Sequence, residues 1–140
     1  DLIQALQSGL KRGVLEAVAS CRLRAPEISE ARSGHGAPMG RTSHRLRNPT
    51  NVAPTWVWPI LENYLSDPSD RSPRTTKISQ HRTGYVEPII TVPLCLSCHG
   101  ESLAAGVAMK IKELYPADQA VGFRTGDLRG VFWIEFPALD

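Results

Sequence analysis

The sequence predicts an α+β fold, in which helices precede an antiparallel sheet. Apolar residues recur at helical spacing near the start of the chain, and two later regions are rich in β-branched and aromatic residues. Helical patterns followed by strand patterns are typical of the α+β class. With 140 residues, of which 41% are hydrophobic and 21% charged, the chain fits a single domain, 1–140, with one core.

Two helices are expected at the N-terminal end. The first covers residues 2–10, where leucine and isoleucine recur at helical spacing, and we expect Gly9 and Gly13 to interrupt it. A second helix begins at Val14. Cys21 falls on the apolar stripe of this second helix, so its thiol is expected to face inward.

The next stretch combines turns with one further helix. Pro26 favours the first turn of a short helix that ends within residues 33–36. Residues 37–46 have little helical signal and are interpreted as a strand or an extended loop. Residues 48–51 form a turn cluster, and the apolar positions of 56–65 recur at helical spacing.

A β-hairpin is expected in the middle of the chain. Residues 67–74 are rich in proline, serine and charged residues, which is typical of an exposed connection. The segments 75–80 and 85–92 have strand patterns, and 82–84 separates them as a turn.

The C-terminal part predicts one helix and the strongest strand. Apolar residues at helical spacing in 103–114 indicate a helix that ends before Pro116. The β-branched and aromatic content of 131–136 suits a central position in the sheet.

The most informative motif is Cys95-Leu96-Ser97-Cys98-His99, because C-x-x-C-H is the attachment signature of a c-type haem. The two thiols add across the two vinyl groups of the porphyrin, and two intervening residues allow one tight turn to reach both. The imidazole of His99 is then held beneath the ring, where it can bind iron. The motif predicts one covalent haem c on Cys95 and Cys98, with His99 as an axial ligand.

Two other uses of this motif remain open. Cys95 and Cys98 could form a redox dithiol, or they could complete a structural zinc site with Cys21 and a histidine. A redox dithiol usually opens a helix in a βαβ context, whereas this motif follows a β-like run and Pro93. Haem attachment gives each residue type of the motif its own role, so we prefer that interpretation.

The compartment follows from the same chemistry. Haem is attached to such motifs on the oxidising side of a membrane, yet residues 1–10 do not look like a signal peptide. We therefore expect a periplasmic or otherwise exported protein whose signal has been removed. The net charge of +2 is too small to favour nucleic acid as a partner, and no run approaches the about 20 apolar residues of a membrane span.

A haem bound by His99 leaves a second axial position to fill. Methionine is the common partner of histidine in cytochromes c, which favours Met39, whereas Met109, His35 and His81 have simpler roles in packing or at the surface. A free cysteine on an apolar helix face is usually a small buried hydrophobe. An unpaired thiol is nevertheless a liability in an exported protein, and ligation of iron by Cys21 would protect it. The full set of candidates is Cys21, Met39, Met109, His35, His44 and His81.

Three arginines close together are candidates for the haem propionates, because guanidinium groups match carboxylates in geometry and charge. They are Arg41, Arg45 and Arg47. The alternative is that each is a solvated surface charge.

Several stretches, in this order along nearly the whole chain, resemble the Tll0287-like family of c-type haem domains. The first is Cys21 with the nearby segment 25–28, and the others are 40–43 running into 46–51, 93–100, 115–116, 122–123 and 126–130. Apart from C-x-x-C-H, each piece alone is weakly specific, and their combination carries the resemblance.

The resemblance implies a PAS-like α+β fold and an unusual pair of iron ligands. In that family the histidine of the motif and a cysteine thiolate from the N-terminal helix bind the iron, which implies His99 and Cys21 here. Met39 departs from the family pattern and could compete for the iron if Cys21 were oxidised or protonated.

Ligation by histidine and thiolate would limit what the domain can do. A thiolate favours ferric iron and lowers the reduction potential, and a six-coordinate iron binds no further ligand until one leaves. We therefore expect a sensor of redox state or of a diatomic gas, and no enzyme activity. The alternatives are a low-potential electron-transfer cytochrome with a redox partner protein, and a structural zinc module.

Overall fold

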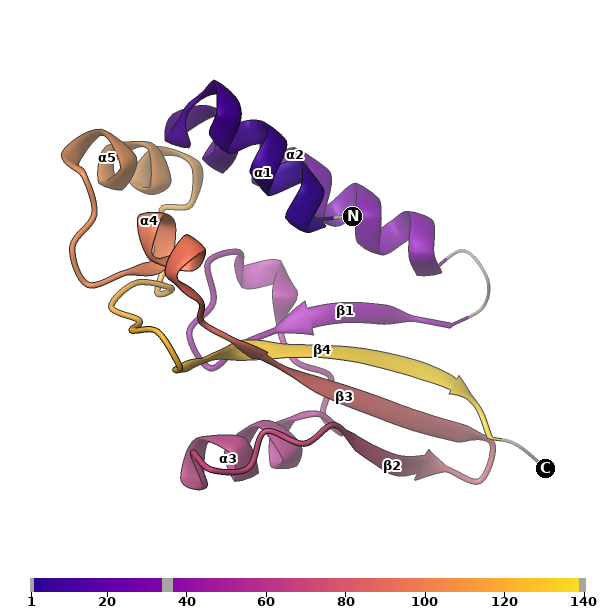
Figure 1. The fold of residues 1–140 in the computed structure, drawn as a ribbon. Helices are drawn as coiled ribbons and strands as arrows, with labels where there is room; N and C mark the ends of the chain where they lie inside the picture. The colour runs from indigo at the N-terminus through magenta and orange to yellow at the C-terminus, as the bar shows by residue number, and fades with distance from the viewer. Residues whose placement is uncertain (1, 34–36, 139–140) are drawn as a thin grey trace.

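The computed structural model describes residues 2–33 and 37–138, and it has the predicted α+β class (Figure 1). A four-stranded antiparallel sheet lies between helices on both of its sides. The strands are β1 (Met39–Thr42), β2 (Arg74–Ser79), β3 (Arg82–Ile90) and β4 (Leu128–Pro137). The helices are α1 (Leu2–Arg12), α2 (Val14–Ser33), α3 (Trp58–Ser66), α4 (Leu96–His99) and α5 (Ala105–Leu114), with 3-10 turns η1 (Pro49–Asn51) and η2 (Pro93–Cys95).

The sheet has the order β1-β4-β3-β2, so β4 is central. This position agrees with its predicted role, because a strand paired on both sides favours β-branched and aromatic residues. The short β1 pairs with it from Met39 opposite Ile134 to Thr42 opposite Val131. The long β3 pairs with β4 from Arg82 to Ile90. The sheet thereby joins an early segment of the chain to its last strand.

The predicted hairpin is present, but its turn lies elsewhere. Residues 82–84, expected to be the turn, belong to β3, and the chain reverses at Gln80 and His81. Gly84 misled the sequence interpretation because glycine is common in turns. Its role is close packing: a Cβ atom there would lie 2.5 Å from the ring of Trp56.

The N-terminal helices also differ from the prediction. Gly9 does not interrupt α1, and its missing side chain allows close contact with α2, because a Cβ atom would lie 2.7 Å from Cα of Ala17. The break comes at Gly13, whose φ of +124° is readily adopted only by glycine. Pro26 lies inside α2 and begins no new helix. An internal proline removes one backbone hydrogen bond, and α2 continues past that loss.

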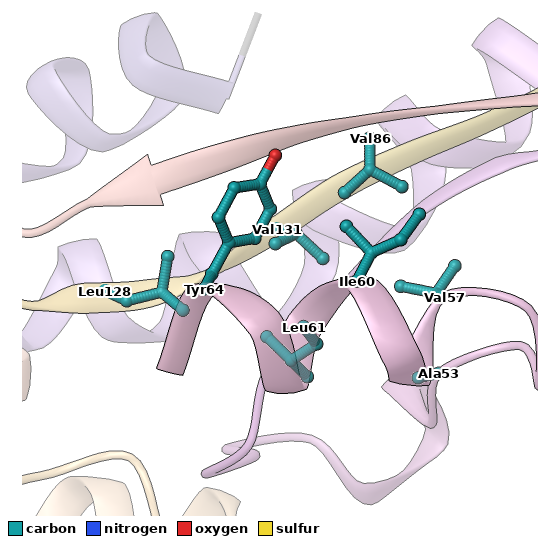
Figure 2. Close-up of a cluster of buried hydrophobic side chains, with 8 residues drawn as sticks. All are labelled: Ala53, Val57, Ile60, Leu61, Tyr64, Val86, Leu128 and Val131. Carbon is teal, nitrogen blue, oxygen red and sulfur yellow. The ribbon is translucent and has the colours of Figure 1, made fainter. Parts of the chain in front are cut away.

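One face of the sheet packs on α3, as Figure 2 shows. Val57 and Leu61 have no solvent exposure and lie against Val86 of β3 and Val131 of β4. Trp56 adds an edge-to-face contact with Trp133, at 6.3 Å between ring centroids. The cluster as a whole comprises Ala53, Val57, Ile60, Leu61, Tyr64, Val86, Leu128 and Val131.

The other side of the sheet is covered by α1 and α2, with α4 and α5 beside them (Figure 1). A smaller cluster here joins Val18 of α2 to Val107 and Ile111 of α5. Cys98 and Tyr115 pack against this cluster. No helix in residues 2–33 or 37–138 is long and apolar enough to cross a membrane.

Leu61→Ala is expected to lower the free energy of unfolding by about 2–5 kcal/mol, because it leaves a cavity in the cluster under the sheet. Urea denaturation followed by far-ultraviolet circular dichroism measures the change. The matched control is Leu65→Ala on the same helix, where the side chain is 40% exposed. Equal losses in the two variants would contradict the assignment of this cluster as the main core.

Candidate cofactor site

A cavity of about 710 Å³ lies between the α1–α2 hairpin and the sheet. Apolar side chains of both helices line one side, and residues of β1, β3 and β4 line the other. All three cysteines of the chain and His99 also line it. The fold therefore brings Cys21 to the same cavity as the distant C-x-x-C-H motif.

The motif itself is a tight helical turn made by η2 and α4. Pro93 sits in the first turn of η2, and the Cys95 amide donates to the Val92 carbonyl at 2.9 Å. The turn ends where the Gly100 amide donates to the Leu96 carbonyl at 3.0 Å. Both cysteines carry free thiols. One compact turn thus presents two thiols and an imidazole to the cavity.

His99 is oriented by the segment that precedes β4. Its Nδ1 lies 2.7 Å from the Ala120 carbonyl, and because a carbonyl only accepts, Nδ1 carries the proton. The Phe123 amide fixes the backbone by donating to the His99 carbonyl at 2.9 Å. Burial, together with Arg129 and Arg47, lowers the pKa of His99 to about 3. The ring is therefore neutral, with the Nε2 lone pair available to a metal, as is usual for a ligating histidine.

Arg47 holds the motif to the same segment. Its Nη2 donates to the Cys98 carbonyl at 2.6 Å and to the Ala120 carbonyl at 3.1 Å. Its Nε donates to Asp118 at 3.1 Å, in an ion pair whose side chains are 13% and 10% exposed. The Ala120 carbonyl therefore accepts from both Arg47 and His99, which couples the position of the imidazole to this ion pair.

Cys21 reaches the cavity from α2, as its place on the helical stripe predicted. Burial raises the pKa of its thiol, while Arg41 and Arg47 act in the opposite direction by favouring the thiolate. Burial also raises the pKa of Cys98. Without a metal the Cys21 sulfur is a neutral thiol, and coordination by a metal would deprotonate it.

The remaining ligand candidates separate by position. Met39 lines the cavity, whereas Met109 is 72% exposed on α5. His81 lies at the exposed hairpin turn, and His44 packs edge-to-face on Phe123 at 5.9 Å. Neither of these histidines lines the cavity. His35 lies outside the described residues.

The three predicted propionate-binding arginines lie in different surroundings. Arg41 and Arg47 line the cavity. Arg45 does not: its guanidinium donates to the Val121 carbonyl at 2.7 Å and stacks 3.8 Å from the centre of the Phe123 ring. Its position therefore gives no support to the propionate role predicted for it.

Three residues of the site were missed as functional residues in the sequence. Arg129 and Tyr115 line the cavity, and Asp118 pairs with Arg47. Arg129 and Tyr115 stand in stretches that carried the family resemblance, which was the available signal for them. Their approach to the motif depends on long-range contacts that no local pattern reports.

The structure weakens the zinc alternative. Within residues 2–33 and 37–138, no three histidine, cysteine, aspartate or glutamate side chains are grouped closely enough to hold a metal ion. A structural zinc site needs four such ligands in a closed shell. The redox-dithiol alternative has no thioredoxin-like setting either, because the motif follows an antiparallel strand, β3.

A haem fits the cavity in size and in donor chemistry. Its volume lies in the range of about 300–1,000 Å³ typical of cofactor sites. Several large apolar side chains at its edge are unusually exposed, with Ile3 at 63%, Val92 at 49% and Phe132 at 46%. A flat apolar ligand would cover them, while Cys95 and Cys98 could bind it covalently and His99 and Cys21 could supply metal donors.

The chain is similar to a known protein family along nearly its whole length. The model of the Tll0287-like family matches residues 4–137. The chain belongs to the Tll0287-like family. The crystal structure of the cyanobacterial heme-protein Tll0287 is similar, with a TM-score of 0.66 and 27% sequence identity over 88% of this chain and 73% of that chain. No curated protein gives a significant match.

For this Tll0287-like chain the family match includes the residues that line the cavity, except Ile3. It runs from α1 to the end of β4 and includes Cys21, the motif and Arg129. The family resemblance predicted from the sequence is thereby confirmed.

Arg47→Gln is expected to lower the free energy of unfolding by about 3–5 kcal/mol, because it leaves the mostly buried Asp118 carboxylate unpaired. Chemical denaturation of the purified protein measures the change. The control is Arg124→Gln, which breaks the ion pair with Glu101, whose side chains are 74% and 54% exposed. That pair should contribute no more than about 1 kcal/mol. Similar losses in both variants would contradict the conclusion that the buried ion pair of Arg47 with Asp118 stabilises the fold.

Proposed function

We propose that residues 1–140 form a single monohaem c-type domain of PAS-like type, with His99 and Cys21 as axial ligands. The observation that carries this proposal is the meeting of all three cysteines and His99 at one cavity. The relative of known structure is described as a heme-protein, which supports the same cofactor.

Each residue of the motif has a separate role in this proposal. Cys95 and Cys98 would hold the haem covalently: each S–H would add across one vinyl group, with sulfur bonding one carbon and hydrogen the other. The neutral His99 offers Nε2 to the metal and is held in orientation by the Ala120 carbonyl. Cys21 offers its sulfur from α2. The cofactor, once bound, supplies an iron that changes between two oxidation states.

The choice of Cys21 over Met39 rests on the family resemblance and on charge. Both side chains line the cavity. Arg41 and Arg47 act on Cys21 in the direction that favours an anionic sulfur. A thioether such as that of Met39 cannot become anionic, so this positive environment favours the thiolate.

We propose that the domain acts as a sensor of redox state or of a diatomic gas, in a periplasmic or otherwise exported location, and that it is no enzyme. Cys21 lies on the α1–α2 hairpin, which contacts the sheet side through β1, and not on the turn that would anchor the cofactor. Loss of the bond between Cys21 and the iron would therefore change the position of the hairpin, while Cys95, Cys98 and His99 keep theirs. A low-potential electron-transfer cytochrome, acting with a redox partner protein, is the alternative.

Cys21→Ala tests the axial assignment. The ferric protein should lose the low-spin thiolate-type signal in electron paramagnetic resonance and should shift its Soret band, because the anionic donor is gone. Covalent haem, measured as the pyridine haemochrome, should remain. Met39→Ala should leave both spectra as in the wild type. A thiolate-type signal that survives in Cys21→Ala would exclude Cys21 as a ligand.

Carbon monoxide distinguishes the sensor from the electron carrier. For a sensor, the reduced protein should shift its Soret band on addition of the gas, since Cys21 must leave before another ligand can bind. An electron carrier retains both ligands, and its spectrum should not change. An unchanged band in the wild type, with a clear shift in Cys21→Ala, would overturn the sensor proposal and leave the ligation intact.

A further inference from the structure

The cavity has an excess of positive charge. Among the residues that the structure describes, its lining includes Arg22, Arg41, Arg47 and Arg129 but no aspartate or glutamate. Guanidinium groups that leave water without a partner are unfavourable. A ligand that fills this cavity is therefore expected to bring negative charge with it.

Two arginines near the motif are already engaged. Arg47 is bonded to Asp118 and to two carbonyls, and Arg45, which does not line the cavity, donates to the Val121 carbonyl. Arg22 is exposed on α2. The cavity arginines that are neither exposed nor paired with an acidic side chain are Arg41 and Arg129.

Arg129 has donors to spare. A guanidinium carries five N–H donors. Within the described residues, Arg129 makes one long side-chain hydrogen bond, 3.4 Å from Nη1 to the Arg45 carbonyl, and lies 5.2 Å from the Phe123 ring centre. Most of its donors are therefore available to a carboxylate, which a guanidinium can bind through two parallel hydrogen bonds.

The charges around Arg129 are unbalanced. Burial, followed by the like charges of Arg47 and Arg41, lowers its pKa to about 10, and Asp118 and Cys95 act in the opposite direction. Arg129 is thus still a cation at neutral pH. Because Asp118 is shared with Arg47, it cannot balance the charge of Arg129 as well.

The backbone fixes Arg129 at the same end of the sheet as Arg41. The Ser43 hydroxyl donates to the Arg129 carbonyl at 2.6 Å, just beyond the pairing of Thr42 with Val131. Gly130 allows this approach, because a Cβ atom there would collide with the Thr42 carbonyl. Both arginines therefore enter the cavity from the paired strands β1 and β4.

We infer that Arg129 and Arg41 form the anion-binding pair of this cavity and bind the two propionate carboxylates of the haem. The inference rests on the proposed haem function. It replaces Arg45 of the sequence-based set by Arg129, and it makes Arg47 a residue that positions the motif.

The test measures the propionate carboxylates directly, in holoprotein made with haem carrying carbon-13 at both of them. Infrared difference spectra against pH give their proton affinity. Arg129→Gln and Arg41→Gln should each raise a propionate pKa by about one unit or more, a tenfold increase in proton affinity, because a cation that stabilised the carboxylate is lost. Arg129→Lys, which keeps the charge, should restore part of the wild-type value.

Arg124→Gln is the matched control, since it removes an exposed arginine already paired with Glu101, and its labelled bands should not change.

A second measurement needs no variant: it compares the propionate pKa of the wild-type protein with that of the haem peptide released from it by a protease. The propionate pKa should be lower in the intact protein, and equal values would overturn the inference. It is also overturned if Arg129→Gln and Arg41→Gln leave the bands unchanged, or if added phosphate shifts them in the wild type, because the arginines would then hold a free anion. Wild-type protein without a pyridine haemochrome would instead refute the proposed function.

Discussion

The guanidinium of Arg47 joins the C-x-x-C-H turn to the segment that precedes β4. It binds the Cys98 carbonyl, the Ala120 carbonyl and the Asp118 carboxylate at once. The Ala120 carbonyl also accepts the Nδ1 proton of His99. The direction of the imidazole, and therefore the nitrogen that it offers to a metal, depends on this shared acceptor. A planar group with several fixed donors can hold such an arrangement, whereas a lysine ammonium could not match it.

The two sides of the sheet have different roles. Beneath it, α3 closes a core of fully buried apolar side chains, which gives β3 and β4 a rigid support. On its other side, the α1–α2 hairpin and the sheet bound a cavity that is lined by cysteines, a histidine and arginines. Polar and charged groups are tolerated on this side because they bind one another or are available to bind a ligand. The main apolar core is thus separate from the cavity, although Arg47 of the cavity also contributes to stability through its ion pair with Asp118.

Local sequence patterns predicted the helices and strands well where apolar periodicity or β propensity alone determined the element. The central position of β4 and the helix after the motif followed from apolar periodicity and β propensity. Glycines and Pro26 were harder to interpret. Gly9 and Gly84 were expected to break elements, yet each lies inside one because a neighbouring backbone or ring needs the space of a side chain. A glycine in a sequence cannot reveal whether it serves a turn or a close contact.

The sequence by itself determined the class of the fold and the family, because these depend on residue types at short or ordered spacing. The tertiary structure decided which distant residues share the cavity. It brought Cys21 and Met39 to the lining, left His44, His81 and Met109 outside it, turned Arg45 away and added Arg129. The physical reason is that strand pairing and helix packing set these distances, and such contacts join residues far apart in the chain.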